Sequence, residues 1–384
     1  MFGGLNAYLQ EKSFLARHTP WFLDRLLDHP ALLRWIGRLG GSTRPESLGP
    51  LCVSMLRGEE GRQRKELRKL LDWLQSEVRP DVVHLSTALL VGMARQISRT
   101  LGVPVVSILS GEDSFVDRLP EPYASQARAV LRERCGDLAA MVALNRYYAD
   151  FMAGYLEVAS DRIHVIRPGL NLVGHRALEP AATPALAPRV GGPTIGFLAR
   201  VCPDKGLHVL AEAIALLAES EPSSPLRLLA AGYMADADRG YLAEIQCRLA
   251  ARGLADRFEY RGTLERDAKI AFLRSLDVMC LPTLLPESKG LPVLEAWANG
   301  IPVVASNHGA FPEMVADTSG GLLVEPGNAS ALAAAIQALV ADRRQASNLG
   351  LQGQTAVHAR YHAERMAREM AQLYRRVVEE NRSP

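Results

Sequence analysis

The chain has 384 residues, of which 48% are hydrophobic and 22% are charged, and its formal net charge is +2. This length exceeds what one core usually fills and predicts two domains, while the composition is that of an ordinary globular protein. The nearly neutral charge argues against a nucleic-acid partner. The sequence contains no run of about 18 apolar residues, so we expect no membrane-spanning helix.

The chain start and the cysteines together predict the cellular setting. No signal-peptide core follows Met1, and the five dispersed cysteines form no CxxC pair, so we expect a reducing, cytoplasmic setting without structural zinc.

Residues 12–38 mix Trp and Phe with Arg. They could form an interfacial patch that holds the protein at the inner face of a membrane, or a solvated helical face of the first domain.

The first half of the chain alternates short apolar runs with helix-like segments. Strands are expected at Leu51–Leu56, Asp81–Leu85, Val103–Leu109, Met141–Leu144 and Ile163–Ile166, with helices such as Arg62–Glu77 and Leu89–Leu101 between them. The strand that normally opens such a domain is missing, because Gly3 and Gly4 lead directly into a helix-like segment. Either the sheet is built differently or the chain lacks its first strand, and we favour the second explanation.

A second alternating series follows a Pro-, Ala- and Gly-rich linker at Gly174–Pro193. Its strands are expected at Thr194–Leu198, Leu226–Ala231, Phe258–Arg261, Val278–Leu281, Pro302–Ala305 and Gly321–Val324, and a last helix at Ala363–Glu380. Alternation of this kind predicts an α/β fold with two Rossmann-like domains facing across a cleft. We expect domains at residues 1–175 and 176–362, with the helix of residues 363–384 packing back toward the first domain. Ligands are expected in the cleft, at the carboxyl ends of strands.

The segment IGFLARVCPDKG places Arg200 and Lys205 after a predicted strand, and Gly206 opens a helix. Two cations and free helix N–H groups at this position suit a diphosphate, although solvated loop charges are the plain alternative. Gly232 and Gly262 follow the next two strands, where a backbone without side chains allows close approach of a ligand; an ordinary strand-to-helix turn explains them equally well.

The segment PESKGLPVLEAWANGIPVVAS carries Glu287 and Glu295 with seven residues between them. Glutamate is rarely buried without a partner, so a bland loop does not explain the pair. The turn Ser288–Gly290 can direct backbone N–H groups at ligand oxygens, and carboxylates are a recurrent means of holding ribose or sugar hydroxyls. A diphosphate, a ribose and a polyol together indicate a nucleotide sugar.

This part of the chain resembles the signature of family-4 retaining glycosyltransferases, which have the two-domain GT-B fold. The matching residues are Glu287, Gly290, Leu291, Pro292, Glu295, Ala296, Gly300, Pro302, Val303, Val304, Gly309, Glu313 and Gly321. The resemblance also covers Arg200 and Lys205-Gly206 and, more weakly, the order of PDVVHLS, PVVSILSGEDSF and IHVIRPGLNL between residues 80 and 172.

The resemblance implies a role for each residue. Arg200 and Lys205 hold the diphosphate and stabilise its departure, and Glu295 accepts the ribose hydroxyls. Glu287 lies near the transferred sugar, whose hydroxyls the backbone of Ser288, Lys289, Gly290 and Leu291 contacts. Gly3 and Gly4 resemble a glycine loop that approaches the donor phosphate. The resemblance implies transfer with retention of anomeric configuration, in polysaccharide or glycoconjugate synthesis, without a required metal or other cofactor.

The sequence departs from the family at two places. Ser288-Lys289 replaces a common Gly-Phe, and the lysine could favour an anionic sugar or face solvent. A histidine that the family often carries in its first domain is absent from Ser110-Gly111-Glu112-Asp113. Glu112 or Asp113 could contact the sugar or acceptor in its place.

Several points stay open at this level. UDP is the first expectation for the donor nucleotide, with GDP and ADP as alternatives, and neither the acceptor nor the oligomeric state is indicated. Asp236-Ala237-Asp238 matches a metal-binding DxD motif but suits a helix cap better. A sugar-nucleotide 2-epimerase of the same fold needs a carboxylate–histidine acid–base pair, which is not evident. The third hypothesis is a catalytically inactive nucleotide-sugar-binding protein.

Overall fold

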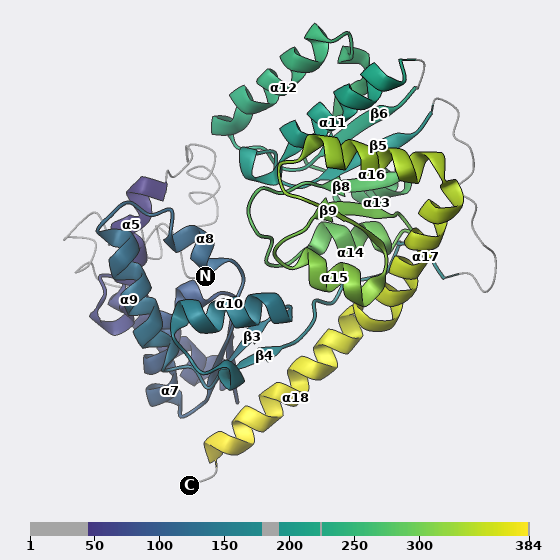
Figure 1. The fold of residues 1–384 in the computed structure, drawn as a ribbon. Helices are drawn as coiled ribbons and strands as arrows, with labels where there is room; N and C mark the ends of the chain where they lie inside the picture. The colour runs from purple at the N-terminus through teal and green to yellow at the C-terminus, as the bar shows by residue number, and fades with distance from the viewer. Residues whose placement is uncertain (1–44, 179–191, 223–224, 383–384) are drawn as a thin grey trace. The chain divides into compact units, whose positions relative to one another are not determined.

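The computed structural model describes residues 45–178, 192–222 and 225–382. The chain divides into two compact units (Figure 1): unit 1 runs to Ile166 and resumes at Glu369, and unit 2 is Arg167–Arg368. The predictions for Gly3, Gly4, residues 12–38 and an absent first strand all concern the part of the chain that lies outside the described residues.

Unit 1 contains a parallel sheet with strand order β1-β2-β3-β4. The strands are β1 (Val83–Leu85), β2 (Val105–Ile108), β3 (Ala140–Ala143) and β4 (Ile163–Val165). The helices are α5 (Pro45–Leu56), α6 (Arg64–Trp73), α7 (Ala94–Leu101), α8 (Glu112–Val116), α9 (Tyr123–Cys135) and α10 (Arg146–Leu156). Shorter helical turns lie at η1 (Gly58–Glu60), η2 (Leu74–Val78), η3 (Ala88–Met93) and η4 (Ser160–Arg162). Valine, isoleucine and alanine dominate the strands, as a sheet covered by helices requires.

The strand expected at Leu51–Leu56 is wrong, because these residues form the end of α5. Cys52, Val53 and Leu56 are buried, which is the i, i+1, i+4 spacing of one helix face. A short apolar run cannot be assigned to a strand or to a buried helix from periodicity alone. The other four strands expected in this half are present within one or two residues of their predicted bounds.

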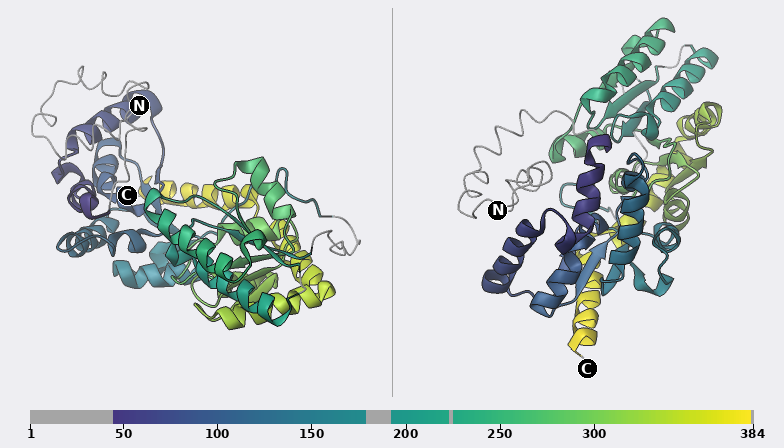
Figure 2. Two further views of the ribbon diagram at one scale, coloured as in Figure 1. Left: turned by 90° about the horizontal axis from the view of Figure 1, so that it is seen from above. Right: turned by 90° about the vertical axis from the view of Figure 1, so that its left-hand side faces the viewer.

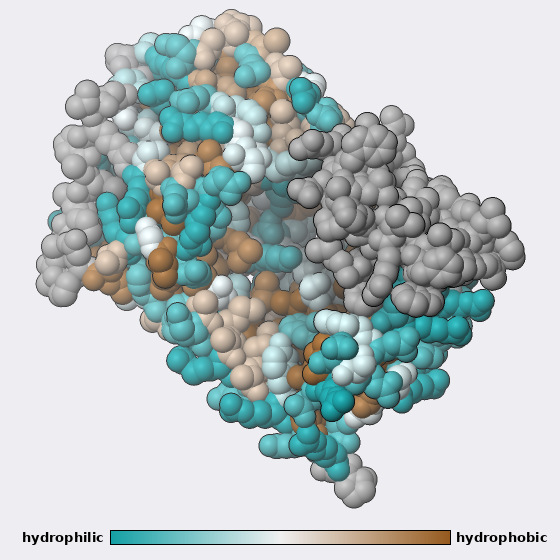
Figure 3. Space-filling model, turned by 180° about the vertical axis from the view of Figure 1, so that it is seen from behind, coloured by the Kyte–Doolittle hydropathy of each residue, from teal (hydrophilic) through white to brown (hydrophobic). Residues whose placement is uncertain are grey.

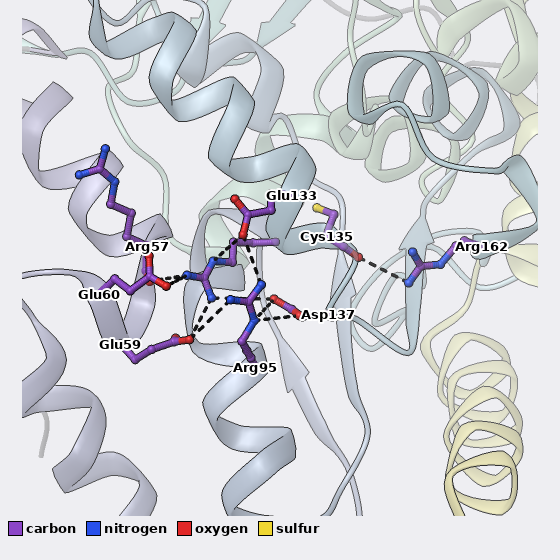
Figure 4. Close-up of polar contacts among 9 residues, drawn as sticks. Arg57, Glu59, Glu60, Arg95, Glu133, Cys135, Asp137 and Arg162 are labelled. Carbon is purple, nitrogen blue, oxygen red and sulfur yellow. Dashed lines mark hydrogen bonds and ion pairs between the residues drawn. The ribbon is translucent and has the colours of Figure 1, made fainter.

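A network of charges joins η1 to α7 and α9 inside unit 1 (Figure 4). Arg134 is 1% exposed, and its guanidinium lies 3.1 Å from a carboxylate oxygen of Glu59 and 3.3 Å from one of Glu60. It also donates to the carbonyl of Arg57 at 3.0 Å. Arg95 lies 3.8 Å from the same oxygen of Glu59. Arginine suits such a site because its fixed fork of five N–H donors can satisfy several acceptors together.

Unit 2 contains a six-stranded parallel sheet with strand order β10-β9-β8-β5-β6-β7. The strands are β5 (Thr194–Leu198), β6 (Arg227–Ala231), β7 (Phe258–Tyr260), β8 (Val278–Leu281), β9 (Val303–Ser306) and β10 (Gly321–Val324). The bounds expected for β5, β8 and β10 are confirmed. The chain leaves β5 toward β6 on one side and later returns to β8 on the other, so the strand order reverses between β5 and β8. Such a switch point leaves a crevice at the carboxyl ends of the two strands.

Helices cover both faces of the unit 2 sheet because successive residues of its strands point to opposite sides. In β8, Val278 and Cys280 pack in one apolar cluster, whereas Met279 and Leu281 pack in another. The first cluster lies under α11 (Leu207–Ser220), α12 (Arg239–Ala251) and α16 (Ala329–Ala341). The second lies under α13 (Arg266–Arg274), α14 (Leu291–Trp297), α15 (Phe311–Thr318) and α17 (Arg343–Arg360). Short 3-10 turns occur at η5 (Pro203–Lys205), η6 (Asp236–Asp238) and η7 (Ala255–Arg257).

The last helix, α18 (Ala363–Arg382), is continuous (Figures 1 and 2), and its residues from Glu369 onward belong to unit 1. Tyr374 bonds to Nδ1 of His84 on β1, and Arg382 pairs with Asp81 at 2.8 Å. No helix in the described ranges is long and apolar enough to cross a membrane. On the face drawn in Figure 3, hydrophilic residues are interspersed with hydrophobic ones.

Candidate functional site

The candidate site lies in unit 2, at the carboxyl ends of β5 and β8. The two strands pair directly, with Ile195 opposite Val278 and Gly196 opposite Met279. The loop after β5 carries Arg200 and Lys205, and the loop after β8 carries Glu287. Adjacent parallel strands thus bring residues more than 80 positions apart in the sequence to the same edge of the sheet.

Two backbone contacts fix these loops to one another. Gly206 has a φ of +75°, and a Cβ at this position would lie 1.9 Å from the carbonyl oxygen of Pro282, so only glycine fits. The N–H of Leu284 donates to the carbonyl of Asp204 at 2.8 Å. The positions of the two loops are therefore set jointly.

Lys205 and Glu287 form an ion pair across the two loops, with 2.6 Å between Nζ and Oε2. The side chains are about one-fifth exposed, at 21% and 19%. Burial raises the pKa of Glu287, but the nearby Lys205 ammonium and the backbone N–H groups of Lys289 and Gly290 outweigh it and leave the pKa below its ordinary value. Glu287 is therefore a carboxylate at neutral pH and already accepts several hydrogen bonds.

Arg200 is exposed, and its guanidinium has no hydrogen-bond or ion-pair partner among the described residues. The free helix N–H groups expected at the start of α11 are not all free. The N–H of His208 donates to the hydroxyl of Tyr241 at 3.0 Å. That part of the prediction is wrong, because the capping group comes from α12 and cannot be inferred from the loop itself.

The turn after Glu287 leads directly into α14. Gly290 caps this helix with a φ of +66°, and a Cβ here would lie 2.4 Å from the sulfur of Met314. Ser288 and Lys289 are half-buried, and Leu291 is exposed. The lysine has no ion-pair partner in the described part of the chain. The predicted donor-binding segment thus forms one short turn whose geometry requires glycine.

Glu295 lies in the second turn of α14 and faces α13, where it pairs with Lys269. Its side chain is 13% exposed. Nδ2 of the fully buried Asn299 donates to the carbonyl of Glu295 at 2.8 Å and bonds to Nδ1 of His175 at 2.9 Å. The helix that carries Glu295 is therefore anchored at its C-terminal end by a buried polar contact.

Gly232 and Gly262 meet at the ends of β6 and β7. The N–H of Gly232 donates to the carbonyl of Gly262 at 2.8 Å. A Cβ on Gly232 would lie 1.8 Å from the carbonyl oxygen of Ala199, whereas a Cβ on Gly262 would meet nothing within 4 Å. Gly232 is therefore required by the packing of the strand ends, and Gly262 leaves open space at the same edge of the sheet.

Glu112 and Asp113 lie in unit 1, at the start of α8. Glu112 is 1% exposed and accepts hydrogen bonds from the Thr87 hydroxyl at 2.6 Å and the Ser110 N–H at 2.6 Å. Asp113 accepts a hydrogen bond from the Tyr148 hydroxyl at 2.6 Å. The carboxylate of Glu112 thus joins the loops after β1 and β2, and a contact of either residue with sugar or acceptor stays a prediction.

Lys269 was not identified from the sequence, although the composition contains a signal for it. The chain has 38 arginines but only six lysines, and the three lysines after residue 70 are Lys205, Lys269 and Lys289. Two of these pair with the two motif glutamates, and the third stands two residues after Glu287. In a chain that otherwise uses arginine, lysine occurs in unit 2 only at this site.

The DxD match forms η6, immediately before α12. Asp236 pairs with Arg239 at 2.8 Å, one turn along η6 and α12. In the ranges that the structure describes, no three His, Cys, Asp or Glu side chains are grouped so as to hold a metal ion.

Comparisons with known proteins agree with this architecture. Residues 18–173 match the family model Glycosyltransferase Family 4, and residues 181–356 match Glycosyl transferases group 1. D-inositol 3-phosphate glycosyltransferase of Jonesia denitrificans is 29% identical over 238 residues, which are 60% of this chain and 55% of that protein. The GDP-mannose-dependent alpha-(1-6)-phosphatidylinositol monomannoside mannosyltransferase of Mycobacterium tuberculosis is 28% identical over 260 residues, 65% of each chain. The solved structure of Anabaena HepE with UDP and glucose superposes with a TM-score of 0.67, at 18% identity over 83% of each chain.

The chain has two Rossmann-like units, which is the architecture of the GT-B class of glycosyltransferase folds. In one of them, cations and a carboxylate lie at the switch point. The two family models follow one another along the chain, and the chain belongs to the family-4 glycosyltransferases, glycosyl transferases group 1. It spans about half the length of the curated relatives it matches, at 55%, 48% and 42% for three of them.

Proposed function

We propose that the chain transfers a hexose from a nucleoside diphosphate sugar to an acceptor, with retention of anomeric configuration and without a required metal. The observation that carries the proposal is the ion pair of Lys205 with Glu287 at the switch point of one parallel sheet, between the loop that also carries Arg200 and the loop that leads into α14 and Glu295. Ligands of doubly wound sheets bind at this position.

Arg200 and Lys205 would neutralise the diphosphate. The side chain of Arg200 has no hydrogen-bond or ion-pair partner among the described residues, so its guanidinium is available to phosphate oxygens. Lys205 would exchange the Glu287 carboxylate for the diphosphate when the donor binds. Charge that develops on the departing diphosphate is stabilised most by cations that are already in place, and this lowers the barrier to departure of the leaving group.

Glu287, released from Lys205, would accept hydrogen bonds from the sugar hydroxyls, together with the N–H groups of the turn from Ser288 to Leu291. Glu295 would accept the ribose hydroxyls, held in place by Lys269. The open space at Gly262 and the close strand ends at Gly232 would admit the flat base. Attack by the acceptor on the face that the diphosphate leaves would give retention.

For the donor, UDP is proposed first, with GDP and ADP as alternatives. Anabaena HepE was solved with UDP, and the Mycobacterium tuberculosis relative is named for GDP-mannose, so related proteins use both bases. For the acceptor, we propose testing inositol-containing molecules first, since two relatives are named for inositol phosphate and phosphatidylinositol acceptors. A glycan, another lipid-linked acceptor or another small molecule would serve the same site.

The experiment is nucleotide release from a panel of UDP-, GDP- and ADP-sugars, with and without inositol acceptors. Glu287→Ala and Arg200→Ala are each expected to reduce release at least 100-fold, the usual effect of removing a group that stabilises developing charge. Glu244→Ala and Arg239→Ala, exposed residues of α12, are the matched controls and are expected to retain release. Equal loss in controls and site variants, or full release by both site variants, would contradict the proposal.

One observation favours an inactive binding protein as the second candidate. Glu112 stands in the segment where the family often carries a histidine, and the hydrogen bonds within unit 1 occupy its carboxylate. Calorimetric binding of one nucleotide, without release from any donor, would favour this candidate over the transferase.

A further inference from the structure

A single tyrosine connects the start of α12 to the start of α11, next to the loop that carries Lys205. The hydroxyl of Tyr241 accepts a hydrogen bond from the backbone N–H of His208 at 3.0 Å. The same oxygen lies 2.8 Å from Nδ1 of His208. The two rings meet edge to face with 5.6 Å between their centroids.

The tyrosine hydroxyl makes two hydrogen bonds to one residue. A phenol has one O–H hydrogen and can accept two hydrogen bonds. The backbone N–H of His208 donates to its oxygen, and the hydroxyl shares a second hydrogen bond with Nδ1 of the same residue. Burial favours the neutral form of both groups, since it lowers the pKa of His208 and raises the pKa of Tyr241 to about 12.

The start of α11 is therefore capped by a side chain rather than left open to a phosphate. N–H groups at a helix start normally lack partners and can bind anions. Here one of them is used, so the diphosphate depends more heavily on the cations of the loop. That loop is held on one side by the contact of Gly206 with the Pro282 carbonyl and on the other by Tyr241, and Lys205 lies immediately before Gly206.

We propose that Tyr241 is a positioning residue for donor binding and turnover: its hydroxyl caps α11 and thereby holds Lys205 where it can exchange Glu287 for the diphosphate. This inference rests on the proposed function of the site. Tyr241 itself does not contact the reacting atoms in this role and acts through Lys205.

A double-mutant cycle between Tyr241→Phe and Lys205→Ala tests the inference on the full chain. Tyr241→Phe removes one hydrogen-bonded hydroxyl and is expected to reduce kcat/KM for the donor about 3- to 10-fold, with part of the loss in donor affinity. In the Lys205→Ala background the same substitution is expected to have no further effect, because its effect passes through the lysine. Tyr155→Phe, which removes a hydroxyl bonded to Asp117 in unit 1, is the matched control and is expected to leave kcat unchanged.

Two outcomes would overturn the inference: an equal loss in both backgrounds, which would mean that Tyr241 acts independently of Lys205, or no loss in the single variant. If the unmodified chain releases nucleotide from no donor, the proposed transferase function has failed on its own. The cycle is then measured on calorimetric binding of UDP and GDP, where the same coupling is expected and additive losses would overturn it. Binding of neither nucleotide would overturn both the donor site and this inference.

Discussion

The two units use ion pairs in opposite ways. In unit 1, Arg134 is almost fully buried and contacts two carboxylates and a backbone carbonyl at once. In unit 2, Lys205 and Lys269 are each paired with one carboxylate and are between one-fifth and one-third exposed. A ligand could exchange with a partner in unit 2, whereas in unit 1 any exchange would leave a buried charge without its partners.

The chemistry of the two cations explains the difference. Arginine has five donors in a rigid plane and satisfies several acceptors permanently, whereas lysine is a compact, strongly hydrated charge on a flexible stem. A partly exposed pair of one lysine and one glutamate adds less to stability than a buried network, and so less is lost when the pair opens. The buried Arg134 therefore suits a structural role and Lys205 suits ligand exchange, and the reciprocal substitutions described below test that division.

The largest effect is expected from Arg134→Lys. One ammonium group cannot satisfy Glu59, Glu60 and the Arg57 carbonyl together, so acceptors around a buried charge lose their partner. We expect the free energy of unfolding to fall by about 3 kcal/mol. Denaturant unfolding checks this, with Arg248→Lys on the exposed face of α12 as the control, for which a change below about 0.5 kcal/mol is expected. An equally small change at Arg134 would show that the network is dispensable.

Acid is expected to affect unit 2 through His175. This side chain is 8% exposed, and burial, followed by Arg266 and Lys269, lowers its pKa from 6.5 to about 4. Because the folded pKa lies below the unfolded one, the unfolded state binds the proton first, and stability present above pH 6.5 is lost as the pH falls toward 4. The expected loss is about 2 kcal/mol at pH 5.

Unfolding measured between pH 7.5 and 5 checks the role of His175. His175→Gln cannot titrate but still offers a polar group to Asn299. We expect this variant to lose about 2 kcal/mol less free energy of unfolding between pH 7.5 and 5 than the unmodified chain. An unchanged slope in this variant would assign the acid sensitivity to other groups.

Lys205→Arg is expected to have a smaller effect, on turnover instead of stability. The larger, planar cation keeps the charge but cannot occupy the same point between Glu287 and the diphosphate, so we expect kcat to fall about 10-fold, or about 1.4 kcal/mol. The free energy of unfolding should change by less than about 0.5 kcal/mol. Stability and steady-state nucleotide release measured on the same preparation check both, and a loss of stability without a loss of turnover would reverse the assigned roles.

The smallest effect is expected from Glu295→Gln. The amide is a weaker acceptor for ribose hydroxyls and no longer pairs with Lys269, so we expect donor affinity to fall about 5-fold, or about 1 kcal/mol. Calorimetry with UDP and 2′-deoxy-UDP separates this from a general loss, because the variant should discriminate less between the two. Glu313→Gln on α15 is a control, and unchanged discrimination in the Glu295 variant would remove the ribose role.

The sequence predicted most of unit 2 because its strands are short, mostly apolar runs with glycine or proline close to their ends. The bounds of β5 and β8 and the meeting of Lys205 with Glu287 follow from the local pattern together with the parallel topology. The α-helical state of Leu51–Leu56 did not, because a buried apolar run has no single period. The pairing of Lys269 with Glu295 and the capping of α11 by Tyr241 depend on how neighbouring helices pack, which local patterns do not encode.

The distribution of lysine also has a consequence for the experimental chemistry of this protein. Residues 167–368 contain only three primary-amine side chains, and two of them are paired with the motif glutamates. An amine-selective acylating reagent would therefore mark unit 2 almost exclusively at its candidate donor site. Protection of Lys205, Lys269 and Lys289 from acylation, followed by mass spectrometry, would report occupancy of that site by any ligand without an engineered label.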